Sequence, residues 1–208
     1  KYTILLFLTK YDNGIYSVAH RFPEMLLMFN NMFHSAWIEQ AIVEYDSDDR
    51  DEYYSKIFAQ YSNFLFGLII FLIPVTKCIF PFVVGQEYEH SWQYIPFMYI
   101  GVIFFGFAAF YGTGYLSTRK TGGIMKTSLL AAILNTLINV IFMKHFGLQT
   151  ASVSSCIAYF VMWIVRLLET RKYFKIKFNY LKIIFLTIIC ILYAIIINKT
   201  NIYESIST

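Results

Sequence analysis

Five long apolar runs alternate along the chain with short polar connections, and the run from Gln93 to Leu116 contains no charged side chain. A helix crosses a membrane core of about 30 Å with about 20 residues, and each run has about this length. The pattern therefore predicts an all-α fold, a polytopic bundle of transmembrane helices. The five runs are 61–83, 93–116, 122–143, 150–168 and 181–198.

A less apolar segment at 14–43 is also predicted to be helical, because its polar residues recur at helical spacing. The pattern divides the chain into three parts. Residues 1–9 are interpreted as the end of a truncated transmembrane helix, and residues 176–208 as an additional transmembrane helix with a short tail. Between them, residues 10–175 form a C-terminal transmembrane bundle of five helices at about 14–43, 61–83, 93–116, 122–143 and 150–168.

Composition supports a membrane protein and argues against a soluble nucleic-acid-binding protein. Hydrophobic residues make up 58% of the chain and charged residues only 14%, whereas about 25% charged residues is usual for a soluble domain. The formal net charge of +4 could indicate a nucleic-acid partner. A soluble nucleic-acid binder would have to hide five apolar spans, so we expect no nucleic-acid partner.

The connections differ in their basic residues, and this difference predicts the topology. Five basic residues lie in 169–182 and three in 117–126, whereas 84–91 has none and 144–149 has one lysine. The positive-inside rule places the first two connections in the cytoplasm and the other two outside. The acidic segment 45–56 is then also cytoplasmic, because one span separates it from 84–91.

Polar residues of the segment 14–43 fall within an arc of roughly 80° on one helix face. A charged side chain deep in hydrocarbon costs several kcal/mol or more, so we expect this arc to face water or polar partners. The alternative is an Arg21–Glu24 pair that only neutralises itself. His20 and His34 lie off the centre of the arc, and packing or hydrogen bonding is favoured over a proton relay for both. The arc consists of Ser17, Arg21, Glu24, Asn31, Ser35 and Glu39.

Two later helices carry weaker polar faces. Asn135 and Asn139 share a face with Ser128, and hydrogen bonding between helices is favoured over cavity lining for the two asparagines. The other face carries Arg166, which lies near the cytoplasmic end and is expected to snorkel to the interface. Its companions are Ser152, Ser155 and Tyr159. Three helices with polar faces in an apolar bundle predict an internal hydrophilic cavity, which is typical of a transporter.

No arrangement of residues indicates catalysis or a cofactor. The chain has no HExxH, no GxSxG, no paired aspartates within a span and no glycine-rich phosphate loop. Its three cysteines, Cys78, Cys156 and Cys190, lack the spacing of a metal or disulfide site. We therefore expect no enzyme activity, no cofactor and no metal.

An ordered set of segments resembles a known family. YDNGIYSVAHRFPEML (11–26), FHSAWIEQ (33–40) and YYSKIFAQY (53–61) are similar to the C-terminal half of polysaccharide-export flippases. These are the Wzx-type transporters of the multidrug/oligosaccharidyl-lipid/polysaccharide (MOP) exporter superfamily. The likeness continues in the same order through SWQYIPFMYIG (91–101), GYLSTRKTGG (114–123), NTLIN (135–139) and FGLQTASVSSCIAY (146–159).

The resemblance implies the second lobe of a two-lobed transporter fold like that of the MATE drug exporters. It implies translocation of undecaprenyl-diphosphate-linked oligosaccharide across a bacterial or archaeal cytoplasmic membrane, for O-antigen or other surface polysaccharide. The implied partners are the lipid-linked substrate, the bilayer, an N-terminal lobe and the polysaccharide polymerase or chain-length machinery. Arg21 stands where relatives often carry a basic residue, which is thought to meet the lipid diphosphate.

Eight residues are therefore expected to line the substrate cavity: Arg21, Glu24, Asn31, Ser35, Glu39, Asn135, Asn139 and Tyr159. Two other functions stay open. A multidrug exporter of the same superfamily would use carboxylates such as Glu24 and Glu39 to hold cationic drugs. A membrane-embedded polysaccharide polymerase or acyltransferase would need a large catalytic loop, and the connections here are short.

Overall fold

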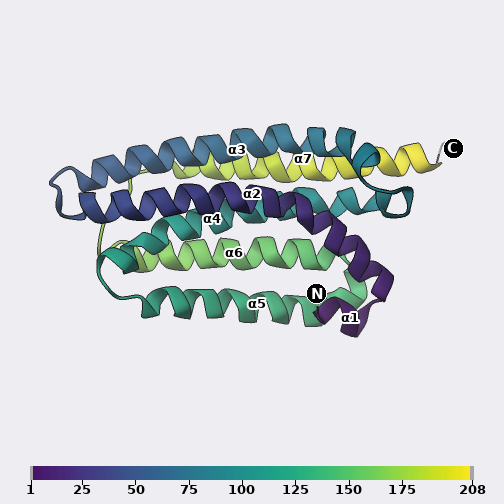
Figure 1. The fold of residues 1–208 in the computed structure, drawn as a ribbon, viewed down its shortest axis with the longest axis horizontal. Coiled ribbons are helices and arrows are strands. Elements are labelled where there is room, and N and C mark those ends of the chain that lie inside the picture. The colour runs from purple at the N-terminus through teal and green to yellow at the C-terminus, as the bar shows by residue number, and fades with distance from the viewer. Residues whose placement is uncertain (1, 207–208) are drawn as a thin grey trace.

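A computed structural model describes residues 2–206, with side chains described at positions 3–198. Its long helices lie along one common axis, and successive helices run in opposite directions (Figure 1). The elements are α1 (Tyr2–Phe7), α2 (Lys10–Val43), η1 (Glu44–Asp46), α3 (Arg50–Val83), η2 (Gln86–Tyr94), α4 (Ile95–Ser117), α5 (Gly122–Phe146), α6 (Gln149–Thr170) and α7 (Tyr180–Ile206).

Five helical segments in the described part of the chain are long and apolar enough to cross a membrane. They coincide with the five apolar runs of the sequence, which confirms the all-α helical bundle and indicates a multi-pass membrane protein. The segments are Arg50–Val83, Gln86–Ser117, Gly122–Phe146, Gln149–Thr170 and Tyr180–Asn198. Helix α2 has 34 residues but is not among them, because polar as well as charged residues lower its hydropathy.

The connection expected at 45–56 is partly helical. Helix α3 begins at Arg50, so the second half of the predicted connection 45–56 is its first turns. Asp51 and Glu52 lie in the first turn, where acidic side chains favour the helix dipole. Tyr54 and Phe58 in the next turns are buried. The amphipathic pattern there extends the helix beyond the apolar run, and packing of the two rings holds it in place.

Helix α4 lies at the centre of the bundle. It is apolar on all sides, and a helix of that kind is normally buried. It packs against α2, α3, α6 and α7, and most of its side chains are inaccessible to solvent. Phe107 and Phe110 from this helix contact the ring of Phe58 from α3, with centroids 5.1 and 5.2 Å apart. Aromatic contacts thus dominate the core around α4.

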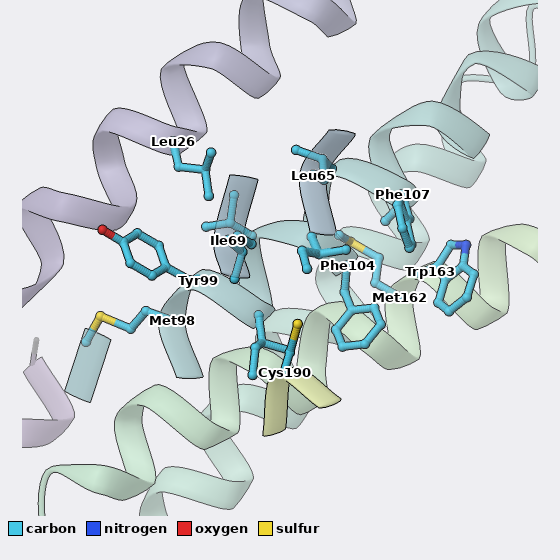
Figure 2. Close-up of a cluster of buried hydrophobic side chains, with 14 of the residues drawn as sticks. Leu26, Leu65, Ile69, Met98, Tyr99, Phe104, Phe107, Met162, Trp163 and Cys190 are labelled. Atoms are coloured by element: carbon cyan, nitrogen blue, oxygen red, sulfur yellow. The ribbon is translucent and has the colours of Figure 1, made fainter. Parts of the chain in front are cut away.

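Side chains from five helices meet in the core (Figure 2). Leu26 comes from α2, Ile69 from α3, Phe104 from α4, Trp163 from α6 and Cys190 from α7. Helix α7 also runs beside α3 along much of its length (Figure 1). The described part of 176–208, interpreted from the sequence as an additional helix with a short tail, therefore packs into the same bundle as the other helices.

The N-terminal segment has its own geometry. Thr9 and Asp12 form a capping box that starts α2, with the Thr9 amide donating to Asp12 and the Asp12 amide to Thr9. Helix α1 ends before this cap, and buries Ile4. Farther along, α2 is visibly bent (Figure 1) and contains Pro23. Proline removes a backbone donor and crowds the preceding turn, which bends a helix.

The two connections with most of the basic residues lie at the same end of the bundle, together with the acidic connection 44–49. The connections 44–49, 118–121 and 171–179 lie at one end, and 84–94 and 147–148 lie at the other (Figure 1). We call the first the basic end, because the connections 118–121 and 171–179 hold Arg119, Lys120, Arg171, Lys172, Lys175 and Lys177. The alternation predicted from loop charge therefore agrees with the order of the helices.

Candidate functional site

A cavity of about 600 Å³ opens between four helices. Residues of α2, α4, α5 and α6 line it, and α4 and α6 lie between α2 and α5 (Figure 1). The two flanking helices do not pack extensively on one another, which leaves space between them. No carboxylate is among the described residues that line the cavity. Its polar lining consists of Asn31, His34, Ser128, Asn135, Thr136, Ser155, Tyr159 and Arg166.

Arg166 is the only cationic residue among those lining residues, and it is 5% exposed. Its guanidinium reaches from α6 to both neighbouring helices. Nε donates to the Thr127 hydroxyl at 2.9 Å, and Nη2 donates to the Ser128 hydroxyl at 3.0 Å. Nη1 donates to the Ala108 carbonyl at 2.8 Å, and Nη2 lies 3.5 Å from the Ile124 carbonyl. All four acceptors are uncharged.

No carboxylate among the described residues forms an ion pair with Arg166. Glu169, one turn later on α6, instead accepts from the Tyr115 hydroxyl at 2.7 Å and pairs with Lys126 at 3.8 Å. A buried ion without a partner costs several kcal/mol, part of which the hydrogen bonds to neutral groups recover. The cavity therefore carries an uncompensated positive charge, and an anion would be stabilised there.

Space for the guanidinium depends on Gly112 of α4. A Cβ atom added at Gly112 would lie 3.0 Å from Nη1 of Arg166. Ala108 and Gly112 are small residues four positions apart on α4, a spacing that lets helix backbones approach closely. Both small residues accommodate Arg166: the Ala108 carbonyl accepts its hydrogen bond, and Gly112 leaves space for its guanidinium.

The expectation that Arg166 snorkels to the interface is wrong. It lies four residues before the end of α6, about 6 Å along the axis, so its depth was estimated correctly. The direction of its side chain was predicted incorrectly, because it points into the bundle instead of toward the interface. Arg166 shares a helix face with Ser155 and Tyr159, and all three line the cavity. Hydroxyl and carbonyl acceptors on α4 and α5 hold it inward, and these acceptors belong to tertiary structure that the sequence pattern does not display.

Asn135 and Asn139 connect α5 to α6, as their favoured interpretation predicted. The Asn135 amide donates to the Ser155 hydroxyl at 3.0 Å, and the Asn139 amide donates to the Ser154 hydroxyl at 2.8 Å. Asn139 also donates to the Asn135 side-chain oxygen at 3.0 Å. Asn135 lines the cavity in addition, whereas Asn139 is buried beside it.

The polar arc of α2 is mostly on the outer surface. Arg21, Glu24, Ser35 and Glu39 are exposed, and none of them lines the cavity, whereas Asn31 does. The four residues therefore do not line this cavity, and their contact with substrate stays a prediction. Methionines surround them on the same face, with Met25, Met28 and Met32 at 64%, 66% and 70% exposure. No helix of the described bundle packs against this face of α2, so its polar residues have no contact with another helix there.

The self-neutralising Arg21–Glu24 pair is not formed. Glu24 accepts instead from Nδ1 of His20 at a distance of 2.9 Å. His34 lies near the Ala109 carbonyl, with Nε2 at 3.1 Å, and also lines the cavity. Packing or hydrogen bonding was the favoured interpretation for both histidines, and these hydrogen bonds confirm it.

Asn30 is a polar residue that the arc did not single out. It is buried and joins three helices, because its amide donates to the Val102 carbonyl at 3.1 Å and its oxygen accepts from the Tyr61 hydroxyl at 2.9 Å. Gly106 of α4 leaves room for this group. Asn30 lies on the apolar face of α2. A single polar residue on an apolar helix face could have predicted this hydrogen bonding between helices.

Among the residues described, no three His, Cys, Asp or Glu side chains gather in a way that could hold a metal ion. Comparisons with protein-family models, with curated proteins and with solved structures give no match for this chain. The class that the fold and the cavity define is an all-α bundle with five candidate membrane-spanning helices.

Proposed function

We propose that this chain is the C-terminal lobe of a flippase that moves a diphosphate-linked lipid oligosaccharide across a cytoplasmic membrane for surface polysaccharide assembly. The resemblance of its ordered segments to polysaccharide-export flippases supplies the substrate class. The five candidate spans and the polar cavity between α2, α4, α5 and α6 are compatible with a transport path.

Arg166 is the observation that carries the proposal. It is a buried cation at a cavity wall, and every acceptor around it is neutral. A guanidinium has five donors, and the hydrogen bonds to Thr127, Ser128, Ala108 and Ile124 leave one Nη1 donor for a ligand. A diphosphate oxygen is a strong acceptor for this group, particularly in a site of low dielectric.

The cavity of about 600 Å³ suits the diphosphate and the first sugar better than the whole substrate. Asn31, Asn135 and Tyr159 provide amide and hydroxyl groups that hydrogen-bond sugars. The lipid tail would remain in the bilayer. In this proposal, the exposed α2 face with Arg21 and Glu39 meets the N-terminal lobe, and the polymerase or chain-length machinery acts on the translocated product.

Drug export, the alternative within the same superfamily, has less support from the cavity. A site for cationic drugs needs a buried carboxylate, and Glu24 and Glu39 lie on the outer face of α2. The lining charge is positive. A substrate with negative charge is therefore favoured over a cationic one.

The test is transport by the complete two-lobed flippase in proteoliposomes that contain a fluorescent undecaprenyl-diphosphate oligosaccharide. Movement between leaflets is followed by quenching the label that reaches the outer leaflet. We expect Arg166→Gln to lower the rate at least tenfold, because the substituted amide keeps hydrogen bonding but loses the charge. Arg166→Lys keeps the charge without the planar donors, and an intermediate rate is expected.

Arg21→Gln serves as the matched control, since it removes the same charge from an exposed position of α2 outside the cavity. Its rate is expected to fall less than that of Arg166→Gln in samples with equal amounts of folded protein. Equal transport by wild type and Arg166→Gln would overturn the assignment of Arg166. Transport of a cationic dye with no movement of the oligosaccharide would overturn the proposed substrate class.

A further inference from the structure

A second cavity, of about 240 Å³, lies at the basic end of the bundle, between the end of α6 and the start of α7. It shares no lining residue with the cavity at Arg166. Arg171 and Lys175 supply its charge. The Tyr180 hydroxyl accepts from Nη2 of Arg171 at 3.2 Å, so the guanidinium is held at the rim by a neutral group.

Tyr111 of α4 closes the inner side of this cavity. It is 3% exposed, and its hydroxyl has no hydrogen-bond partner among the described residues. An unpaired buried hydroxyl costs about 1–3 kcal/mol, and a ligand acceptor at this point would remove that cost. Two basic side chains and one unpaired donor therefore converge on the same small volume.

The charge of this cavity is not neutralised within the lobe. Among the described side chains, no carboxylate forms an ion pair with Arg171 or Lys175. Glu169 on the preceding turn of α6 is held by Tyr115 and Lys126. Lys172 and Lys177 in the same connection add further positive charge. The ligand that fits this set of groups is an anion.

An apolar groove of about 310 Å³ lies next to the cavity, along α7. Phe178 and Tyr180 line both spaces, with ring centroids 4.3 Å apart. Deeper in the groove, Phe104 and Trp163 stack at 5.8 Å (Figure 2). Ile184 and Ile188 of α7 form its outer wall. The basic pocket and the apolar groove therefore lie side by side, with Phe178 and Tyr180 between them.

We infer that the pocket and the groove together bind one anionic phospholipid from the leaflet at the basic end. The phosphate would lie between Arg171, Lys175 and Tyr111, and one acyl chain would follow the groove beside Trp163. Basic clusters next to membrane helices attract anionic lipids at about 1 kcal/mol per Lys or Arg. This inference does not rest on the proposed transport activity.

The test is lipid retention by the purified protein in detergent, measured by native mass spectrometry. The protein is incubated with equal amounts of phosphatidylglycerol and phosphatidylcholine that carry the same acyl chains. We expect wild type to retain phosphatidylglycerol about tenfold over phosphatidylcholine. Arg171→Gln with Lys175→Gln should bring this ratio near one. Tyr111→Phe should lower it severalfold, since it removes only the hydroxyl.

Two matched controls separate this site from general effects. Arg119→Gln with Lys120→Gln removes the same charge at the same end, away from the cavity, and should keep the preference. Ile184→Trp fills the groove from its exposed side and should reduce phosphatidylglycerol retention. Leu192→Trp, equally exposed on α7 but outside the groove, should not.

Equal retention of the two lipids by wild type would overturn the inference, as would an unchanged preference in the Arg171/Lys175 double variant. Competition with inorganic phosphate distinguishes the source of the anion. Phosphatidylglycerol that stays bound in millimolar phosphate supports a lipid site. Complete displacement would mean that the pocket takes free phosphate, and the lipid assignment would fail.

Discussion

Nη1 of Arg166 lies 2.8 Å from the carbonyl oxygen of Ala108 on the neighbouring helix α4. This hydrogen bond positions a buried cation at the cavity wall, and it needs the absence of a side chain at Gly112, one turn farther along α4. The small residues of α4 and the arginine of α6 are therefore one structural unit. A change to either partner should affect the cavity in the same way.

Gly112→Val should displace the guanidinium, because the added Cβ would be 3.0 Å from Nη1 and the branch carbons would come closer. We expect anion binding to weaken about as much as in Arg166→Gln, with a loss of roughly 1–3 kcal/mol in stability from overpacking. Gly67→Val is the control, since a Cβ atom there meets nothing within 4 Å. Substrate binding and thermal unfolding of both variants check this. Unchanged binding by Gly112→Val would contradict the role of Gly112.

Gly106→Ala should destabilise the protein through the Asn30 group. The new Cβ would be 2.4 Å from the Tyr61 hydroxyl oxygen and 3.0 Å from the Asn30 amide nitrogen. We expect a loss of about 1–3 kcal/mol. Adding Tyr61→Phe removes the nearest atom and should recover part of it. Thermal unfolding of the single and double variants measures this, and a double variant that only sums the two losses would argue against the predicted contact.

The sequence predicted the helices well, because apolar runs of membrane length constrain secondary structure strongly. It predicted the direction of single polar side chains less well. Arg166 and Asn30 both turn inward because acceptors on other helices receive them, and helical periodicity on one segment does not contain that information. Arg21 and Glu39 lie on a consistent face, as expected, but the cavity is formed by a different side of α2 and by three other helices.

Asn139→Leu should weaken the contact between α5 and α6. Asn139 donates to Ser154 of α6 and, within α5, to Asn135. A hydrogen bond between membrane helices contributes about 0.6 kcal/mol on average, so we expect a loss of about that size. Leu137→Ala, at an exposed position of the same helix, should cost less. Unfolding in a mild denaturing detergent compares the two, and equal stability of Asn139→Leu and wild type would show that the network does not stabilise the helix pair.

The orientation of the bundle is tested by cysteine labelling in intact cells, in a background where the exposed Cys78 is replaced by alanine. Single cysteines at Lys120 and Lys172 report the basic end, and one at Glu87 reports the opposite end. The positive-inside rule predicts that an impermeant maleimide reaches only position 87, and that positions 120 and 172 react after the membrane is permeabilised. Substitution at three exposed connections leaves the core intact, so protein amount should be equal in all samples. Labelling of position 120 or 172 from outside would invert the topology, and the pocket at Arg171 would then face the outer leaflet.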